Sequence, residues 1–525
     1  DICGHDLQRR AVDSGSAALD RRVVARQLLS VAITAARFSR PARAARWLRR
    51  MAFLVHRWLG IALALLMAIW ALSGFVMMYV SFPETTREER LAGLAPLDLA
   101  GCCGKAVIPD RSLTETAGVE MVAGKPVLRL SGLNGVALVS LDGSKPVEVG
   151  RREAGEIAAT HLRRTFGISP AFWVEPIDHD QWTVYQRLRK LAPLFKVSFA
   201  DEHGTVLYVS GLTGEVVQDT TARERFWNWL GAVPHWLYFT ALRQNTPLWS
   251  KVVIYASTLG VFLTLTGIYA GLRMYGRGKS RSPFRGIALW HHWTGLIFGI
   301  ATLIWVFSGL TSMTPWSWLE SKGPSTEQNA LAGRAIIPSD YAALVHSLAA
   351  HPQPGVVSAE LIVQSGRPFA VLAQANGIRR RASLPELVPA QMSNIDLAGL
   401  AHMAKPTASI RSQGMIQTRD EYYYAHHGQI LLPAWRVIYA DKDSTRLYFD
   451  PRTGEMVGHV DPGSRAYRWW HSGLHQLDFA AISARPLWDA IVLTLLTGVS
   501  LLCLLGVAMG IRRLGWRSRI SRRSA

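Results

Sequence analysis

Four histidines at repeated spacings are the residues of this chain best suited to hold a metal-containing cofactor. His56 opens "HRWLG" and His291 opens "HHWTG", 235 residues later (291 − 56 = 235). His235 in "VPHWLYF" and His475 in "GLHQLDF" lie 240 residues apart (475 − 235 = 240). A neutral imidazole nitrogen is a common ligand of iron and other transition metals. The spacing predicts two sites, each built from one histidine of either half of the chain.

The elements that must position these histidines are membrane-spanning helices. The chain has 525 residues, of which 49% are apolar. Four stretches of about 20 residues, the length that crosses roughly 30 Å of hydrocarbon, contain no Asp, Glu, Lys or Arg: 59–80, 252–272, 294–314 and 490–511. We therefore predict a four-span helical membrane protein.

The net charge of +20 lies mainly at the ends of these spans. Basic residues precede the first span, fill the gap between the second and third, and follow the fourth, as in Arg46, Arg49, Arg50, Arg273, Arg277, Arg281, Arg512 and Arg513. This distribution argues against a nucleic-acid-binding surface. By the positive-inside rule both termini and the short middle loop are cytoplasmic, and the two long connections lie outside.

The chain repeats itself. "LAPLFKVSFADEHGTVLYVSGLTGEVV" aligns with "LLPAWRVIYADKDSTRLYFDPRTGEMV", which places Thr213-Gly214-Glu215 on Thr453-Gly454-Glu455 at a shift of 240 (453 − 213 = 240). Trp70 and Ser73 match Trp305 and Ser308 at the shift of 235. An even number of spans per copy predicts a parallel duplication, with a pseudo-two-fold axis along the membrane normal. Alternating strand patterns and helical patches predict one small α+β domain in each long connection.

These patterns predict the boundaries of nine segments. A basic, disordered cytoplasmic leader is expected at 1–50, with Met51 as an alternative start. The other predicted segments are the spans 51–81, 249–275, 287–314 and 487–513, the external domains 82–248 and 315–486, the cytoplasmic loop 276–286 and the cytoplasmic tail 514–525.

Haem is the cofactor that fits two opposed imidazoles. Its iron accepts axial histidine ligands, and its apolar macrocycle can lie between helices rich in glycine and tryptophan. A single histidine at a membrane boundary is more often an interfacial residue, but both pairs occur in duplicate. The sequence therefore predicts two b haems, one between His56 and His291 and one between His235 and His475. His292 and His471 remain alternative ligands.

Other reactive residues carry weaker signals. His161 and His402 match at a shift of 241 and are expected on solvated helix faces, whereas His426 and His427 have no counterpart in the first half. The adjacent pair Cys102 and Cys103 suits either a metal or a disulfide. Cys503 lies within a predicted span, where it is expected to be a small apolar residue.

The repeated phrases resemble a known family. "VHRWLGIALALLMAIWALSGFVMMYV", "WHHWTGLIFGIATLIWVFSGL", the two "LYxxxxTGE" turns and "RWWHSGLHQLDF" followed by "RPLWD" are similar to PepSY-associated transmembrane proteins of the bacterial inner membrane. The resemblance covers about residues 47–514. It implies PepSY-like periplasmic domains and, as in the related di-haem siderophore-iron reductases, haem-ligand roles for the four histidines.

The expected function is electron transfer across the membrane. A cytoplasmic or quinol donor would supply electrons, and the resemblance implies that periplasmic ferric iron or a ferric siderophore would accept them. We therefore expect the chain to be a haem-dependent ferric reductase. The alternative is a non-enzymatic membrane module whose external domains bind a peptide or a protease. A third hypothesis, a metal-binding transport accessory, would use the external histidines alone.

Overall fold

The computed structural model describes residues 44–99, 102–103, 114–133, 135–143, 147–277, 281–425 and 430–521. His426, His427 and residues 1–43 of the predicted leader lie outside these ranges. The chain divides into two compact units. The first comprises the described parts of Asp1–Leu65, Leu259–Leu303 and Leu501–Ala525, and the second comprises those of Leu66–Thr258 and Ile304–Ser500.

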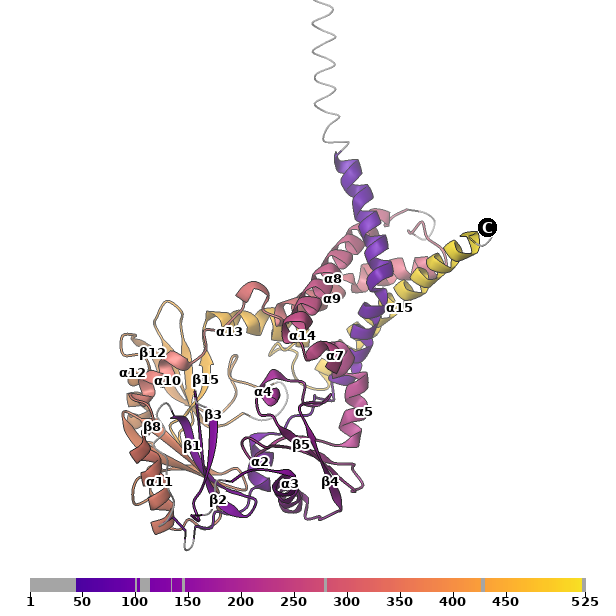
Figure 1. The fold of residues 1–525 in the computed structure, drawn as a ribbon. Helices are drawn as coiled ribbons and strands as arrows, with labels where there is room; N and C mark the ends of the chain where they lie inside the picture. The colour runs from indigo at the N-terminus through magenta and orange to yellow at the C-terminus, as the bar shows by residue number, and fades with distance from the viewer. Residues whose placement is uncertain are drawn as a thin grey trace, which may run out of the picture. The chain divides into compact units, whose positions relative to one another are not determined.

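Within the described residues, four helices are long and apolar enough to cross a membrane, which agrees with the predicted number of spans (Figure 1). They are Ala44–Met77, α8 (Thr246–Met274), α9 (Ile287–Ser312) and α15 (Leu487–Ser521). A helix satisfies its backbone hydrogen bonds internally, which hydrocarbon requires. The described part of the first helix starts at Ala44, so residues 44–50 are helical.

Glycines on these helices face aliphatic side chains of neighbouring helices. In the first unit, a Cβ added to Gly60 would lie 3.7 Å from Leu263, and one added to Gly299 would lie 3.1 Å from Ile268. Because glycine has no side chain, such positions let helix backbones approach closely without an aqueous driving force. These glycines therefore serve helix packing.

The second unit is built around antiparallel sheets. Its largest sheet has seven strands in the order β11-β10-β9-β8-β1-β2-β3. The strands are β1 (Thr114–Val122), β2 (Lys125–Gly132), β3 (Gly135–Ser140), β8 (Val356–Gln364), β9 (Arg367–Gln374), β10 (Arg379–Ser383) and β11 (Val388–Pro389). β1 pairs with β8 so that Val119 lies opposite Ala359. The two long connections thus share one sheet.

Two further sheets have four strands each. One contains β4 (Phe172–Ile177), β5 (Leu194–Phe199), β6 (Val206–Ser210) and β7 (Val216–Thr220), and the other contains β12 (Ile410–Ile416), β13 (Ala434–Tyr439), β14 (Arg446–Phe449) and β15 (Met456–Val460). These sheets confirm the α+β composition that the strand patterns predicted.

Helices cover the sheets through apolar faces. The predicted helical patches form α3 (Arg151–Phe166) and α11 (Pro338–Ala350). α11 packs against the seven-stranded sheet, α3 against β5 and β6, and α12 (Asn394–Ala404) against β13 and β14. Other short helices are α2 (Arg87–Gly93), α4 (Gln186–Arg189), α5 (Ala222–Leu230), α6 (Ala232–His235), α7 (Thr240–Arg243), α10 (Ser325–Ala332), α13 (Pro462–Tyr467) and α14 (Leu474–Gln476).

The repeated Thr-Gly-Glu turns have a structural role. Gly214 and Gly454 adopt φ angles of 68° and 75°, a conformation that favours glycine. Glu215 forms ion pairs with Arg90 and Arg129, at 3.2 and 3.1 Å. The same two arginines contact buried Glu120 on β1.

A related ion pair joins Glu455 to Arg379 at 2.7 Å in the other half of the unit. Each turn is therefore fixed to the seven-stranded sheet by charge. The Glu of this motif therefore has a structural role in both halves.

Two predictions about individual residues are settled here. His402 is exposed, as expected, but the solvated position expected for His161 is wrong, because His161 is 5% exposed. Its ring packs against Gly93, where an added Cβ would lie 1.8 Å from Nδ1.

Cys102 and Cys103 are joined by a disulfide, and Cys503 is a buried free thiol.

Candidate functional site

The first histidine pair meets in the first unit. His56 comes from the helix Ala44–Met77 and His291 from α9, and their ring centroids are 6.3 Å apart with an interplanar angle of 34°. Nδ1 of His56 donates a hydrogen bond to the carbonyl oxygen of Leu263 on α8, at 3.1 Å. A carbonyl oxygen only accepts, so the proton of His56 lies on Nδ1 and the lone pair lies on Nε2.

The second ring of this pair has an orphaned nitrogen. Nδ1 of His291 is buried and lacks a hydrogen-bond partner within the part of the chain that the structure describes. The backbone of Leu502 on α15 lies near this imidazole, but the geometry between them is not that of an ordinary hydrogen bond. Leu263 and Leu502 are 239 residues apart (502 − 263 = 239), so the two rings have matching neighbours.

A glycine lies against each of these rings. A Cβ added to Gly267 on α8 would lie 2.6 Å from Cε1 of His56, and one added to Gly506 on α15 would lie 3.6 Å from Cε1 of His291. The glycines are again 239 residues apart (506 − 267 = 239). Each imidazole thus occupies space that a side chain at the glycine would otherwise fill. The contact is closer at Gly267 than at Gly506.

His292, the alternative to His291, has both ring nitrogens engaged. Nδ1 lies 2.9 Å from Oγ of Ser282, and Nε2 lies 2.9 Å from the carbonyl oxygen of Gly271. Nε2 must donate to the carbonyl, so Nδ1 accepts from the serine hydroxyl. No lone pair remains for a metal. This geometry favours His291 as the ligand and makes His292 a link between α9, α8 and the segment at Ser282.

The second histidine pair meets in the second unit. His235 ends α6 and His475 lies in α14, and their ring centroids are 6.0 Å apart with an interplanar angle of 70°. The π-helix Arg468–Gly473 directly precedes α14. Single π turns are often found at functional sites. Here the π turn brings His471 onto His475, with ring centroids 5.2 Å apart.

Matched serines fix the tautomers of this pair. Oγ of Ser73 donates to the carbonyl of Trp70 and lies 3.0 Å from Nδ1 of His235. In the same way, Oγ of Ser308 donates to the carbonyl of Trp305 and lies 3.0 Å from Nδ1 of His475. Since each hydroxyl proton is already used, each Nδ1 donates to Oγ. Nδ1 of His235 also lies 3.2 Å from the carbonyl oxygen of Trp70, which can only accept. Both Nε2 atoms therefore carry the lone pair, as a metal ligand requires.

Burial keeps these imidazoles neutral. It lowers the pKa of His235 to about 4 and that of His475 well below its ordinary value. His471 also has a lowered pKa because it is buried. Its Nδ1 lies 3.1 Å from the carbonyl oxygen of Ser308, so its proton lies on Nδ1, its Nε2 carries the lone pair, and His471 stays an alternative to His475.

The separation of the paired rings suits one metal between them. A metal–nitrogen bond is about 2 Å long and an imidazole nitrogen lies about 1 Å from its ring centre, so two rings that share a metal have centroids about 6 Å apart. Among the described residues, no group of three or more His, Cys, Asp or Glu side chains could hold a metal ion. A metal held between two imidazoles would need a group that brings the remaining ligands, as a porphyrin does.

The sequence prediction found the histidines but missed their neighbours. Ser73 and Ser308 recur at a shift of 235, and Gly267 and Gly506 recur at a shift of 239. The sequence alone, however, does not indicate what these four residues contact. Gly309 also faces a histidine of the pairs, since a Cβ added there would lie 3.8 Å from Cε1 of His475.

Comparison with known proteins gives no independent support for a family. No protein-family model matches the chain, and the search of curated proteins found no match.

Proposed function

We propose that this protein is a b-haem electron-transfer protein that spans the bacterial inner membrane and reduces a periplasmic ferric complex, such as a ferric siderophore. The observation that carries the proposal is the presence of two histidine pairs, each with ring centroids about 6 Å apart. His56 and His291 would hold one haem and His235 and His475 the other. Bound haem would supply a one-electron carrier at each position.

The residues of the chain would prepare these sites. The carbonyl of Leu263 and the hydroxyls of Ser73 and Ser308 hold protons on Nδ1 and so present Nε2. Gly267 and Gly506 leave room for the first pair of rings. The apolar walls of the helices would exclude water and favour an apolar macrocycle.

A tandem duplication with a pseudo-two-fold axis accounts for this arrangement. Strands β5, β6 and β7 begin 240 residues before β13, β14 and β15, respectively (434 − 194, 446 − 206 and 456 − 216). Val119 and Ala359, which pair across β1 and β8, are separated by the same number (359 − 119 = 240). We infer that the copies are PepSY-like modules, with external domains and with both termini in the cytoplasm.

The test is the reduced-minus-oxidised absorption spectrum of the purified protein, combined with haem stoichiometry. We expect b-type bands and two haems per chain. His56→Ala and His475→Ala should each remove about one of the two, while His402→Ala, at an exposed position, should remove none. Absence of haem from a folded protein would refute the proposal and favour the alternative, a peptide- or protease-binding module.

A further inference from the structure

A small pocket lies in the first half of the second unit, beside strand β1. Its volume is about 90 Å³. α2 contributes Arg90 to its lining, the turn between β1 and β2 contributes Ala123 and Gly124, α3 contributes His161, and the Thr-Gly-Glu turn contributes Glu215. A pocket of this size has room for a small molecule and not for a folded partner.

The backbone N–H groups of the turn between β1 and β2 are free to donate. Ala123 and Gly124 have φ angles of 48° and 75°, and neither N–H group has a hydrogen-bond partner among the described residues. The corresponding turn of the second half is Ser365-Gly366, between β8 and β9, with φ angles of 53° and 73°. Its N–H groups donate to the carbonyl oxygens of the last two residues of α10, at 2.9 and 2.8 Å. Acceptor oxygens therefore occupy these positions in the second half, whereas the pocket lies at them in the first.

His161 supplies a further donor. It lines the pocket and is 5% exposed, yet neither ring nitrogen forms a hydrogen bond with a described residue. Neither nitrogen is sealed from solvent, so a ligand in the pocket can reach the ring. Polar groups buried to this degree normally have a partner. In a neutral imidazole one nitrogen donates and the other accepts.

Arg90 adds a guanidinium with an unused edge. Its Nη1 contacts Glu120 at 2.9 Å and Glu215 at 3.2 Å. Within the described part of the chain, no hydrogen bond of Arg90 uses Nε or Nη2. Two parallel N–H groups on one guanidinium edge match the two oxygens of a carboxylate.

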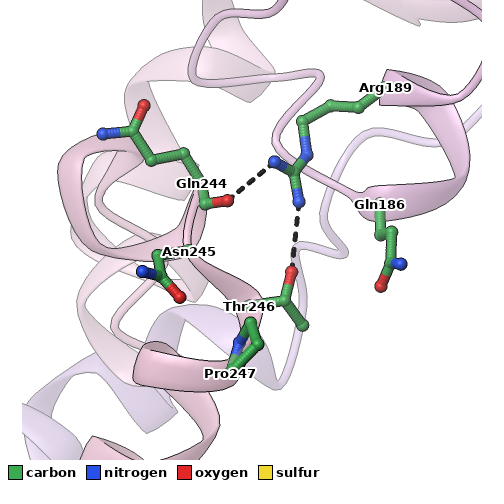
Figure 2. Close-up of a pocket in the computed structure, with 6 residues that line it drawn as sticks. All are labelled: Gln186, Arg189, Gln244, Asn245, Thr246 and Pro247. Atoms are coloured by element: carbon green, nitrogen blue, oxygen red, sulfur yellow. Dashed lines mark hydrogen bonds between the residues drawn. The ribbon is translucent and has the colours of Figure 1, made fainter.

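The larger pocket at the start of α8 differs in this respect. Figure 2 shows the guanidinium of Arg189 closing onto the turn before α8. Its two Nη atoms donate to the carbonyl oxygen of Gln244 at 2.7 Å and to Oγ1 of Thr246 at 3.1 Å. These donors link parts of the fold, so a ligand there would have to replace existing hydrogen bonds.

The carboxylates in the lining of the small pocket are neutralised within the protein. Glu120 and Glu215 are each paired with Arg129, at 3.2 and 3.1 Å, as well as with Arg90. Two arginines thus balance two carboxylates, and the free hydrogen-bonding groups decide which ligand fits. Most of these groups are donors, namely the turn N–H groups, one imidazole N–H and the guanidinium edge. An ionised carboxylate only accepts hydrogen bonds and therefore matches them.

We propose that this pocket binds the carboxylate of a small organic acid through the N–H groups of Ala123 and Gly124, the imidazole of His161 and the guanidinium of Arg90. The site is independent of the haem proposal. The bound acid would join the β-turn to α2 and α3 in the first half, in the place of the direct hydrogen bonds between turn and helix in the second half.

The test is a saturation-transfer NMR titration of the full-length protein in detergent, at constant ionic strength, with acetate and separately with acetamide. The two probes have nearly the same shape, but only acetate is charged. We expect saturable binding of acetate and about tenfold weaker binding of acetamide, because charge-assisted hydrogen bonds are roughly twice as strong as neutral ones.

Two substitutions test the site separately. Arg90→Lys keeps a positive charge near Glu120 but loses the planar edge, and His161→Phe keeps a ring against Gly93 but removes both nitrogens. Each should weaken acetate binding about tenfold. Arg87→Lys is the matched control, because Arg87 lies on α2 but outside the pocket lining. It should bind acetate as the unmodified protein does.

The contrary outcomes are distinct. A lack of saturable acetate binding in the unmodified protein, or equal affinity for acetamide, would overturn the proposal. Unchanged affinity in both pocket variants, or an equal loss in Arg87→Lys, would also overturn it. Unfolding curves recorded in parallel show whether each variant is folded. If Arg90→Lys does not fold, His161→Phe decides alone.

Discussion

Gly267 lies directly against the imidazole of His56, so that an added Cβ would come within 2.6 Å of Cε1 and 2.9 Å of Nδ1. The counterpart Gly506 leaves 3.6 Å to Cε1 of His291. α8 therefore leaves no room for a methyl group beside His56, whereas α15 leaves ordinary contact distance beside His291.

This difference predicts unequal effects of the same substitution. Gly267→Ala should displace the His56 ring, because atoms cannot approach within 2.6 Å without a shift, and should reduce haem occupancy to about one per chain. Gly506→Ala should retain two. The measurement is haem stoichiometry from the absorption spectrum of denatured samples. Equal loss in the two variants would show that the glycine contacts do not control the site.

The hydrogen bonds of His292 predict that it supports the fold and does not bind a metal. His291→Ala should remove one haem, because it deletes the proposed ligand. His292→Gln should keep both haems and lower the thermal stability, because the contacts with Ser282 and Gly271 are weakened. Spectra and unfolding curves of the two variants decide between these residues. The reverse pattern would assign the ligand to His292.

The serine contacts predict an effect on cofactor affinity at the second pair. Ser73→Ala and Ser308→Ala each remove the side-chain acceptor of the Nδ1 proton, and loss of such a partner typically lowers affinity by about 10–100-fold. Nδ1 of His235 keeps the carbonyl of Trp70 as an acceptor at 3.2 Å, so the effect of Ser73→Ala should lie at the lower end of this range. Haem titration of the depleted protein would measure this change. Ser312→Ala is a suitable control, because Ser312 lies on α9 like Ser308 but donates its hydroxyl proton to the carbonyl of Gly309. Affinity equal to that of the control would contradict the assigned tautomers.

Buried His161 predicts a pH dependence of stability. Burial lowers the pKa of His161 from 6.5 to about 4. Between these values the unfolded chain binds more protons, so the stabilisation is complete above about pH 6.5 and is lost as the pH falls towards 4. The shift corresponds to about 3 kcal/mol.

The measurement is thermal unfolding between pH 7 and pH 4. His161→Phe keeps a ring against Gly93 but cannot titrate, so its decline over this range should be smaller than that of the unmodified protein. Exposed His402 provides the control, and His402→Phe should leave the decline unchanged. Identical pH profiles for all three proteins would rule out His161 as a source of the effect.

The spans and histidine pairs were predictable because their signals are local or repeated. A charge-free run of about 20 residues indicates a span by itself, and equal spacing indicated which histidines to pair. The burial of His161 also had a local signal that was not used. Ala154, Ala158 and Leu162 form the apolar stripe of α3, and His161 lies three residues after Ala158 on the same face.

Other features have no local signal. Nothing within β1 or β8 indicates that they pair with each other, because this pairing depends on the tertiary positions of segments about half the chain apart. The convergence of Arg189 and Arg243 on the hydroxyl of Thr246 also escaped prediction, because the two guanidinium groups reach it from different helices.

The pairing of β1 with β8 has a consequence for biosynthesis. Val119 leaves the ribosome 240 residues before its partner Ala359 (359 − 119 = 240). At about 5–20 residues per second, this interval lasts roughly 10–50 seconds. During that time the strand edge of the first half is uncovered and open to pairing with another nascent chain. The strand edge of the first half therefore stays open to wrong pairing until β8 has been made.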